Sequence, residues 1–275
     1  MVEGRFTGGQ PYLRLGQGPP LLMATGLLPR SGNPVGLQRH LTIAGAAPFA
    51  AHFTVYVVNR RTGLPPGTSM SDLAGHLAEA VRHDLGGSAL VHGTSTGGSV
   101  ALQLAVDHPE LVRRMVVASA ACRLGPVAQR GQAEFARRVE AGDRRGAWAP
   151  MIEPGMPRPM RPLALAAAWL FGPRLLPADS SDLLRTIAAE DAFDVEAALG
   201  RVQAATLVLG GGADPFYSED LFRRTATGIP QGRAMVFPRR GHVGAASSRT
   251  AVAAALAFLR HPVRPSTIDA TEGLL

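Results

Sequence analysis

The sequence contains one cysteine, Cys122, and no lysine in 275 residues. A lone cysteine excludes an internal disulfide. No potential metal ligands stand at a suitable spacing around Cys122, so we expect Cys122 to be a small, buried hydrophobic side chain. All 28 basic residues are arginines, which are scattered over separate segments although the net charge is +7. Nucleic-acid binding usually needs a concentrated basic face or a recognisable motif. We therefore expect no nucleic-acid partner.

Long hydrophobic runs are also missing. The longest, residues 163–171, has nine residues, whereas a bilayer span needs about 20. Residues 1–6 lack the basic region and apolar core of a secretory signal. We expect no membrane span and a cytoplasmic location.

With 275 residues, 46% of them hydrophobic, the chain can bury one large α/β core. Short apolar runs at residues 21–24, 53–58 and 115–118 alternate with helix-compatible stretches. Such alternation predicts βαβ units and a mostly parallel central sheet flanked by helices. Ligand sites of these sheets lie at the carboxyl ends of the strands.

One motif lies at such an end. The apolar run 88–91 leads into Gly93-Thr94-Ser95-Thr96-Gly97, and a helix-compatible stretch, 99–107, follows. This is the context of a nucleophile elbow, in which a strained turn exposes the serine hydroxyl and glycines avoid a clash. The backbone N–H of Thr96 would lie beside a developing oxyanion. Upstream, the strand 21–24 ends in a glycine loop, where Leu27 is our candidate for the second oxyanion donor.

A serine at neutral pH needs a base to take its proton and an acid to orient that base. Asp214 follows the predicted strand 205–209, and His242 follows the strand 234–237. Each catalytic candidate also has a structural interpretation: Ser95 as an inert turn serine, Asp214 as the start of a turn before proline, His242 as a loop histidine. His92, within the strand before the elbow, is expected to be structural.

The alternation breaks between residues 123 and 203, which we predict to form a helical cap over the site. Residues 1–122 and 204–262 would form the core, and 263–275 a loosely ordered tail. Prolines crowd residues 150–162 and exclude regular helix there. Six large side chains are candidates for an apolar substrate pocket, although packing within the cap and against the sheet is the simpler interpretation for most of them: Trp148, Met151, Met156, Met160, Trp169 and Phe171.

The chain resembles α/β-hydrolase-fold proteins with an inserted cap. The resemblance rests on Gly16-Gln17-Gly18-Pro19-Pro20, the Ser95 motif, Gly211-Gly212-Ala213-Asp214-Pro215 and Gly241-His242, in this order over nearly the whole length. It implies Ser95 as nucleophile, His242 as base, Asp214 as orienting acid, Thr96 and Leu27 as oxyanion donors, and no cofactor or metal. Thr25 stands where many relatives carry histidine, and Asn59 where many carry an acidic residue.

The resemblance implies a serine hydrolase that cleaves an ester, lactone, thioester or related acyl bond of a small, largely apolar substrate, most simply a carboxylic ester. The alternative is a non-hydrolytic protein of the same fold, either a biosynthetic cyclase or lyase or a non-catalytic binder of small ligands. Fold analogy does not choose the substrate. The sequence leaves open whether the chain is a monomer or a homodimer.

Overall fold

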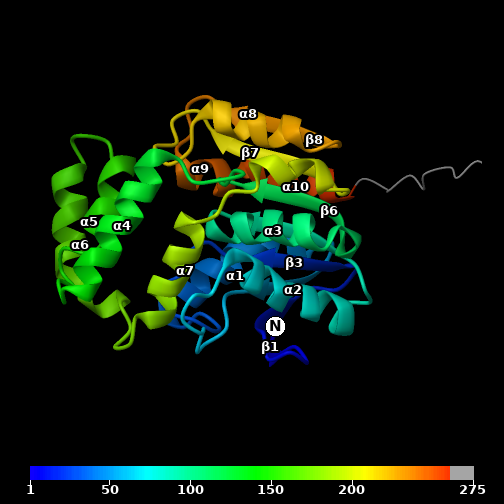
Figure 1. Ribbon diagram of the computed structural model, residues 1–275, viewed down its shortest axis with the longest axis horizontal. Helices are drawn as coiled ribbons and strands as arrows, with labels where there is room; N and C mark the ends of the chain where they lie inside the picture. Colours follow the sequence, from blue (N-terminus) through cyan, green and yellow to red (C-terminus); the bar gives the residue numbers. More distant parts are fainter. Residues whose placement is uncertain (261–275) are drawn as a thin grey trace, which may run out of the picture.

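The computed structural model describes residues 1–260, which are built around an eight-stranded sheet (Figure 1). Its strand order is β1-β2-β4-β3-β5-β6-β7-β8. The pairs β1–β2 and β2–β4 are antiparallel, and all other pairs are parallel. The expected mostly parallel sheet is confirmed, with one additional edge strand, β1. The strands are β1 Val2–Arg5, β2 Pro11–Leu15, β3 Pro20–Ala24, β4 Thr54–Val58, β5 Ala89–Thr94, β6 Val112–Ala118, β7 Ala205–Gly211 and β8 Gly232–Phe237.

Helices cover both faces of the sheet, and a further group lies to one side (Figure 1). Helices α2, α3 and α8 pack on one face, and α1 and α10 pack on the other. The helices are α1 Gly36–Ala50, α2 Met70–Asp84, α3 Thr96–Asp107, α4 Pro126–Glu140, α5 Ala149–Ile152, α6 Arg161–Leu175, α7 Ser181–Asp191, α8 Glu219–Gly228, α9 His242–Ser247 and α10 Arg249–Arg260, with 3-10 turns η1 Pro109–Leu111, η2 Glu153–Gly155 and η3 Glu196–Arg201.

Alternation along the strands divides the core into two layers. In β3, Leu22 and Ala24 pack under α2 and α3, whereas Leu21 and Met23 pack on the side of α1 and α10. All four are buried. Because helices cover both faces, the parallel strands are apolar at nearly every position, and each fully buried leucine stabilises the fold by about 2 kcal/mol. This rigid sheet fixes the positions of the loops at its carboxyl edge.

The start of α2 follows the local rules of helix capping. The backbone N–H of Asp72 donates to the hydroxyl of Ser69 at 3.1 Å, and the N–H of Ser69 donates to the Asp72 carboxylate at 2.8 Å. This reciprocal pair satisfies two amides that have no partner within the helix. Gly86 and Gly87, both at positive φ, follow the last turn. Residues within or next to the helix therefore set both ends of α2.

Helices α4, α5 and α6 lie together at the left of Figure 1, beyond the sheet, and α7 lies between them and the sheet. A separate small core, which includes Phe135, Leu183 and Ile187, joins this group. In the proline-rich stretch only the single turns α5 and η2 form before α6 begins at Arg161. Pro162 lies in the first turn of α6, where a missing N–H costs no hydrogen bond.

Within residues 1–260, no helix is long and apolar enough to cross a membrane. The last described helix, α10, ends at Arg260. The predicted tail, 263–275, lies outside the described residues, as do the last two residues of the predicted core.

Candidate active site

The turn between β5 and α3 holds Ser95 in a strained conformation. Its φ of 52° and ψ of −127° lie in a region that residues with side chains seldom adopt. A side chain at Gly93 would overlap the backbone of Gly97, and one at Gly97 would overlap the carbonyl groups of Ala24 and Thr25. The elbow is therefore possible only because both flanking positions are glycine.

His242 lies between Ser95 and Asp214. Its Nε2 is 3.1 Å from the Ser95 hydroxyl oxygen, and its Nδ1 is 2.8 Å from Oδ2 of Asp214. The Asp214 side chain is fully buried, whereas 19% of the His242 side chain is exposed. Because β5, β7 and β8 are parallel, the three residues that follow them meet at one edge of the sheet. The structure thus brings together the three residues that the sequence proposes.

The second oxygen of Asp214 has its own partner. Oδ1 accepts the backbone N–H of Phe216 at 2.9 Å, which is the bond expected of an aspartate that begins a turn. Asp214 therefore shapes the turn and faces His242 at the same time. Its bond to the turn fixes the carboxylate in the orientation that His242 requires.

Three further residues hold the His242 ring and backbone. The ring stacks on Tyr217 at 5.9 Å, with an angle of 10° between the planes, and meets Phe216 edge-on at 5.0 Å. The Ser119 hydroxyl donates to the backbone carbonyl of His242 at 2.6 Å. Ser119 itself has a φ of 53°, which marks a second constrained position at the carboxyl edge. Sequence reasoning did not find Ser119 or Tyr217, because both act through tertiary contacts.

A buried carboxylate also lies behind the elbow. Glu190 of α7 accepts hydrogen bonds from the hydroxyls of Thr96 and Ser99, at 2.8 and 3.1 Å, and from the side-chain amide of Gln132, at 3.0 Å. Burial raises the pKa of Glu190, and these bonds lower it in part. A clue in the sequence was the position of this acid on the apolar side of an amphipathic helix. The network ties α4 and α7 to the first turn of α3.

The two predicted oxyanion donors lie beside Ser95. Thr96 is the first residue of α3, and Gly26, which precedes Leu27, is so near that an added Cβ would lie 3.3 Å from the Ser95 Cβ. Within residues 1–260, the backbone N–H groups of Leu27 and Thr96 donate to no other backbone carbonyl. Both amides are therefore available to a ligand.

The six pocket candidates divide into two groups. Trp148 packs on Phe135, with 4.8 Å between the ring centroids, and its indole N–H donates to the carbonyl of Gly172 at 3.3 Å. Met151 packs against the same small core. The Arg145 guanidinium lies over the Trp169 ring at 4.1 Å. Met156 is half-buried, whereas Met160, Trp169 and Phe171 are each more than half exposed.

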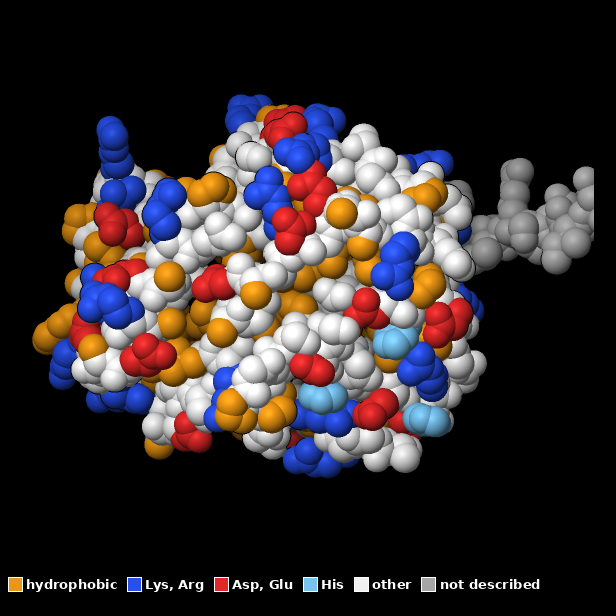
Figure 2. Space-filling model, in the orientation of Figure 1, with side chains coloured by type: hydrophobic (Ala, Val, Ile, Leu, Met, Phe, Trp, Pro, Cys, Tyr) orange, Lys and Arg blue, Asp and Glu red, His pale blue; other side chains and the backbone are white. Residues whose placement is uncertain are grey.

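The exposed group follows from the composition of α6. The helix is apolar on all sides, but only Ala168 and Gly172 of it are buried, so its larger side chains point outward. Figure 2 shows hydrophobic and arginine side chains interspersed over this part of the surface. Met160, Trp169 and Phe171 therefore lie at the surface of the described structure, and their part in an apolar substrate pocket stays a prediction.

In the part of the chain that the structure describes, no three His, Cys, Asp or Glu side chains are grouped closely enough to hold a metal ion. The buried Cys122 has a raised pKa because of its burial. It forms no part of the Ser95 site.

Several solved structures resemble this chain over nearly its whole length. A hydrolase from Pseudomonas aeruginosa PA01 matches with a TM-score of 0.75 at 23% identity, over 94% of this chain and 98% of that one. An alpha/beta hydrolase enzyme from a Medee basin deep-sea metagenome library matches with a TM-score of 0.77 at 16% identity, over 97% and 100%. The enol-lactonase from Burkholderia xenovorans LB400 matches with a TM-score of 0.73 at 18% identity, over 94% and 100%.

These structures share the fold of the chain. The family model described as "Alpha/beta hydrolase family" matches residues 34–255, a segment that includes Ser95, Asp214 and His242. This match covers well over half of the sequence and agrees with the sheet order and the strained elbow. The protein belongs to the alpha/beta hydrolase family.

Proposed function

We propose that this protein is a serine hydrolase that cleaves an acyl bond, most simply a carboxylic ester, in a small and largely apolar substrate. The observation that carries the proposal is the position of His242, whose two ring nitrogens lie within hydrogen-bond distance of Ser95 and Asp214. Lactones and thioesters are cleaved by the same chemistry and remain within the proposal. The reaction needs no cofactor.

In the first half of the reaction, the hydroxyl oxygen of Ser95 attacks the substrate carbonyl carbon while Nε2 of His242 takes the hydroxyl proton. Asp214 accepts a hydrogen bond from the Nδ1–H and stabilises the imidazolium that forms. The carbon–oxygen double bond becomes a single bond to an oxyanion. The backbone amides of Leu27 and Thr96 would donate to this oxyanion.

Collapse of the tetrahedral intermediate expels the alcohol, which leaves with the proton from His242, and the acyl group stays on Ser95. A water molecule then loses a proton to His242 and attacks the acyl carbon. The second intermediate expels the Ser95 oxygen, which recovers its proton from His242. The products are a carboxylic acid and an alcohol, and the protein returns to its initial state.

The helices α4 to α7 are proposed as the cap of this site. The support for this role is the hydrogen bond from Thr96 to Glu190 of α7, which connects the helical group to the residue proposed as an oxyanion donor. A cap tied to the first turn of α3 can hold that turn in place while the substrate enters.

The test is labelling of Ser95 with a fluorophosphonate probe, combined with rates on p-nitrophenyl esters of rising chain length, lactones and thioesters. Ser95→Ala and His242→Ala should each lose nearly the whole contribution of the triad, on the order of 10⁶ in rate, because its members act as a unit. Ser71→Ala, which removes an exposed hydroxyl on α2, is the control and should keep full activity. Absence of labelling together with unchanged hydrolysis by Ser95→Ala would refute the proposal.

A further inference from the structure

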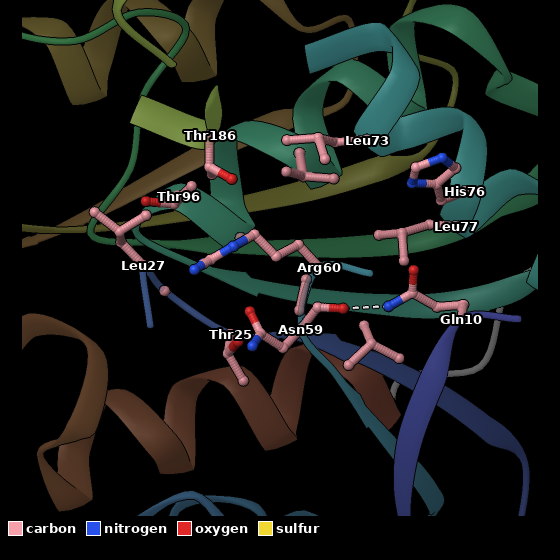
Figure 3. A pocket seen from close by; sticks show the side chains of 15 residues that line it. Gln10, Thr25, Leu27, Asn59, Arg60, Leu73, His76, Leu77, Thr96 and Thr186 are labelled. Carbon is pink, nitrogen blue, oxygen red and sulfur yellow. Dashed lines mark hydrogen bonds between the residues drawn. The ribbon is translucent and has the colours of Figure 1, made fainter. Parts of the chain in front are cut away.

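A small hollow lies between the ends of β3 and β4 and the helices α2, α3 and α7. We call it the Arg60 cavity (Figure 3). Its lining combines leucine side chains from α2 with the polar side chains of Thr25, Arg60 and His76. Gly26, Leu27 and Thr96 also line it, so the cavity borders the proposed oxyanion site.

Arg60 is the unusual member of this lining. Only 9% of the residue is exposed, and one guanidinium nitrogen, Nη2, donates to the carbonyl of Pro29 at 3.1 Å. Its Nε is buried without a hydrogen-bond partner. Among the described residues, no carboxylate lies within 4.0 Å of its nitrogens. Such a buried charge is costly unless it is paired.

Burial lowers the pKa of Arg60 to about 10, and attraction to Asp182 opposes the shift. The guanidinium therefore remains charged at neutral pH. Asp182 is not a close partner, because its carboxylate accepts the backbone N–H groups of Gly63 and Leu64 at 2.9 and 2.8 Å. The positive charge of Arg60 thus faces the cavity without a matched anion.

Two more polar atoms in the lining have no partner. The hydroxyl oxygen of Thr25 and Nδ1 of His76 are both buried and form no hydrogen bond. In Figure 3 the Arg60 side chain extends toward Leu27 and Thr96, whereas His76 lies at the other end of the cavity. The Nε–H of Arg60 and the Thr25 hydroxyl are both donors without a partner, which favours a ligand that supplies hydrogen-bond acceptors.

Gly26 and Thr96 line this cavity and lie beside Ser95, which does not line it itself. A Cβ built on Gly26 would lie 4.0 Å from the Ser95 hydroxyl oxygen, and Gly26 lines the cavity itself. A substrate with its scissile carbonyl at Ser95 can therefore extend past Gly26 toward Arg60. A guanidinium favours a planar anion with two oxygens, which it binds through paired N–H donors.

We propose that Arg60 is a specificity residue that binds a carboxylate on the substrate, so that the preferred substrates are monoesters of short dicarboxylic acids. The inference rests on the proposed function, since it takes Ser95 as the nucleophile. The rest of the lining mixes polar residues such as Gln10 and Asn59 with apolar side chains, among them Leu73 and Leu77, and the apolar part suits the methylene chain between the ester and the acid.

The first experiment compares monoethyl esters of succinate, glutarate and adipate with the diethyl esters of the same acids, by titration of the acid released. The free acid should raise kcat/KM about 10- to 100-fold for at least one chain length, as one charge-assisted bond in a buried site allows. Arg60→Gln should remove this preference, so that the monoethyl and diethyl esters of each acid give similar kcat/KM. Arg61→Gln is the matched control, because Arg61 adjoins Arg60 but pairs with Glu79 at 2.6 Å. It should keep the preference.

The second experiment separates this inference from the proposed function. Calorimetric titration of Ser95→Ala with glutarate, succinate and adipate measures binding without turnover, and one of the three should bind at least tenfold more weakly when Arg60→Gln is added. Binding without any ester hydrolysis would refute the proposed function and support the Arg60 site. Hydrolysis with equal kcat/KM for acid and neutral esters at every chain length would overturn the inference and support the function. Because this comparison uses the natural chain, it decides the question even if Arg60→Gln fails to fold.

Discussion

Acidification should destabilise this protein through one buried histidine of β5. His92 is 5% exposed, its Nδ1 has no hydrogen-bond partner, and its ring meets Phe49 edge-on at 5.2 Å. Burial lowers the pKa of His92 from 6.5 to about 4. The ring is therefore neutral in the folded protein at pH values where the unfolded chain already carries the proton.

Proton uptake by the unfolded chain decides whether acid stabilises or destabilises the fold. Between pH 6.5 and pH 4 the unfolded state binds more protons at this residue, so the free energy of unfolding falls as the pH falls. The two pKa values differ by about 2.5, which amounts to about 3 kcal/mol once the pH is below 4. Between pH 7 and pH 5 the loss is about 2 kcal/mol. The effect is absent above the pKa of the unfolded chain.

The assay is urea unfolding at pH 7 and pH 5 of the natural protein and of His92→Leu. Burial raises the pKa of Glu190, and that of Asp191 to about 6, and both changes act in the opposite direction. The difference between the two proteins, rather than either curve alone, therefore isolates His92. The natural protein should lose about 2 kcal/mol more than His92→Leu, or roughly 4–8 °C in Tm. His52→Leu, which removes an exposed histidine, should follow the natural protein. Equal pH dependence of the natural protein and His92→Leu would refute the argument.

Three further predictions concern the surroundings of the site. Gly97→Ala should destabilise the fold by about 1–3 kcal/mol, because the added Cβ would overlap two carbonyl groups. Gly75→Ala should instead stabilise the fold by about 0.5–1 kcal/mol, because Gly75 lies within α2 and a Cβ there meets open space. Thermal unfolding measures both effects. Glu190→Ala removes the acceptor of three hydrogen bonds and should cost about 2–4 kcal/mol in urea unfolding; a loss under 1 kcal/mol contradicts the network. Ser119→Ala removes the bond to the His242 carbonyl and should lower kcat of ester hydrolysis roughly fivefold at unchanged KM; a rise in KM alone would indicate that Ser119 contributes to substrate binding.

The sequence was sufficient to predict those features that depend on local rules or on the topology of a parallel sheet. The elbow depends on the two glycines that flank Ser95 at a distance of two residues. Asp214 and His242 each follow a predicted strand, and this order predicted that both would lie close to Ser95. The start of α2 depends on Ser69 and Asp72, which are three residues apart. In each case the interacting groups are close in the chain, or are brought to the same sheet edge by the parallel topology alone.

Other features depend on contacts that no local pattern encodes. Ser119 and Glu190 acquire their roles from the packing of β6 and α7 against distant segments. The exposure of Trp169 follows from which side of α6 has a neighbour, and a helix that is apolar on all sides does not reveal this. The edge strand β1 and the short helix α9 were also not predicted. Arg60 resembled any other surface arginine in the sequence, and only the structure reveals that it is buried.

The order of the strands along the chain determines when the proposed active site is completed during synthesis. Ser95 and His242 are 147 residues apart. His242 follows β8, which is the last strand within residues 1–260 and the outermost of them on its side of the sheet. A nascent chain that has left the ribosome only as far as Asp214, just after β7, carries the proposed nucleophile and its acid but no base. Hydrolysis on the proposed mechanism therefore starts only when β8 has docked, and the first turnover by a growing chain reports that its sheet is complete.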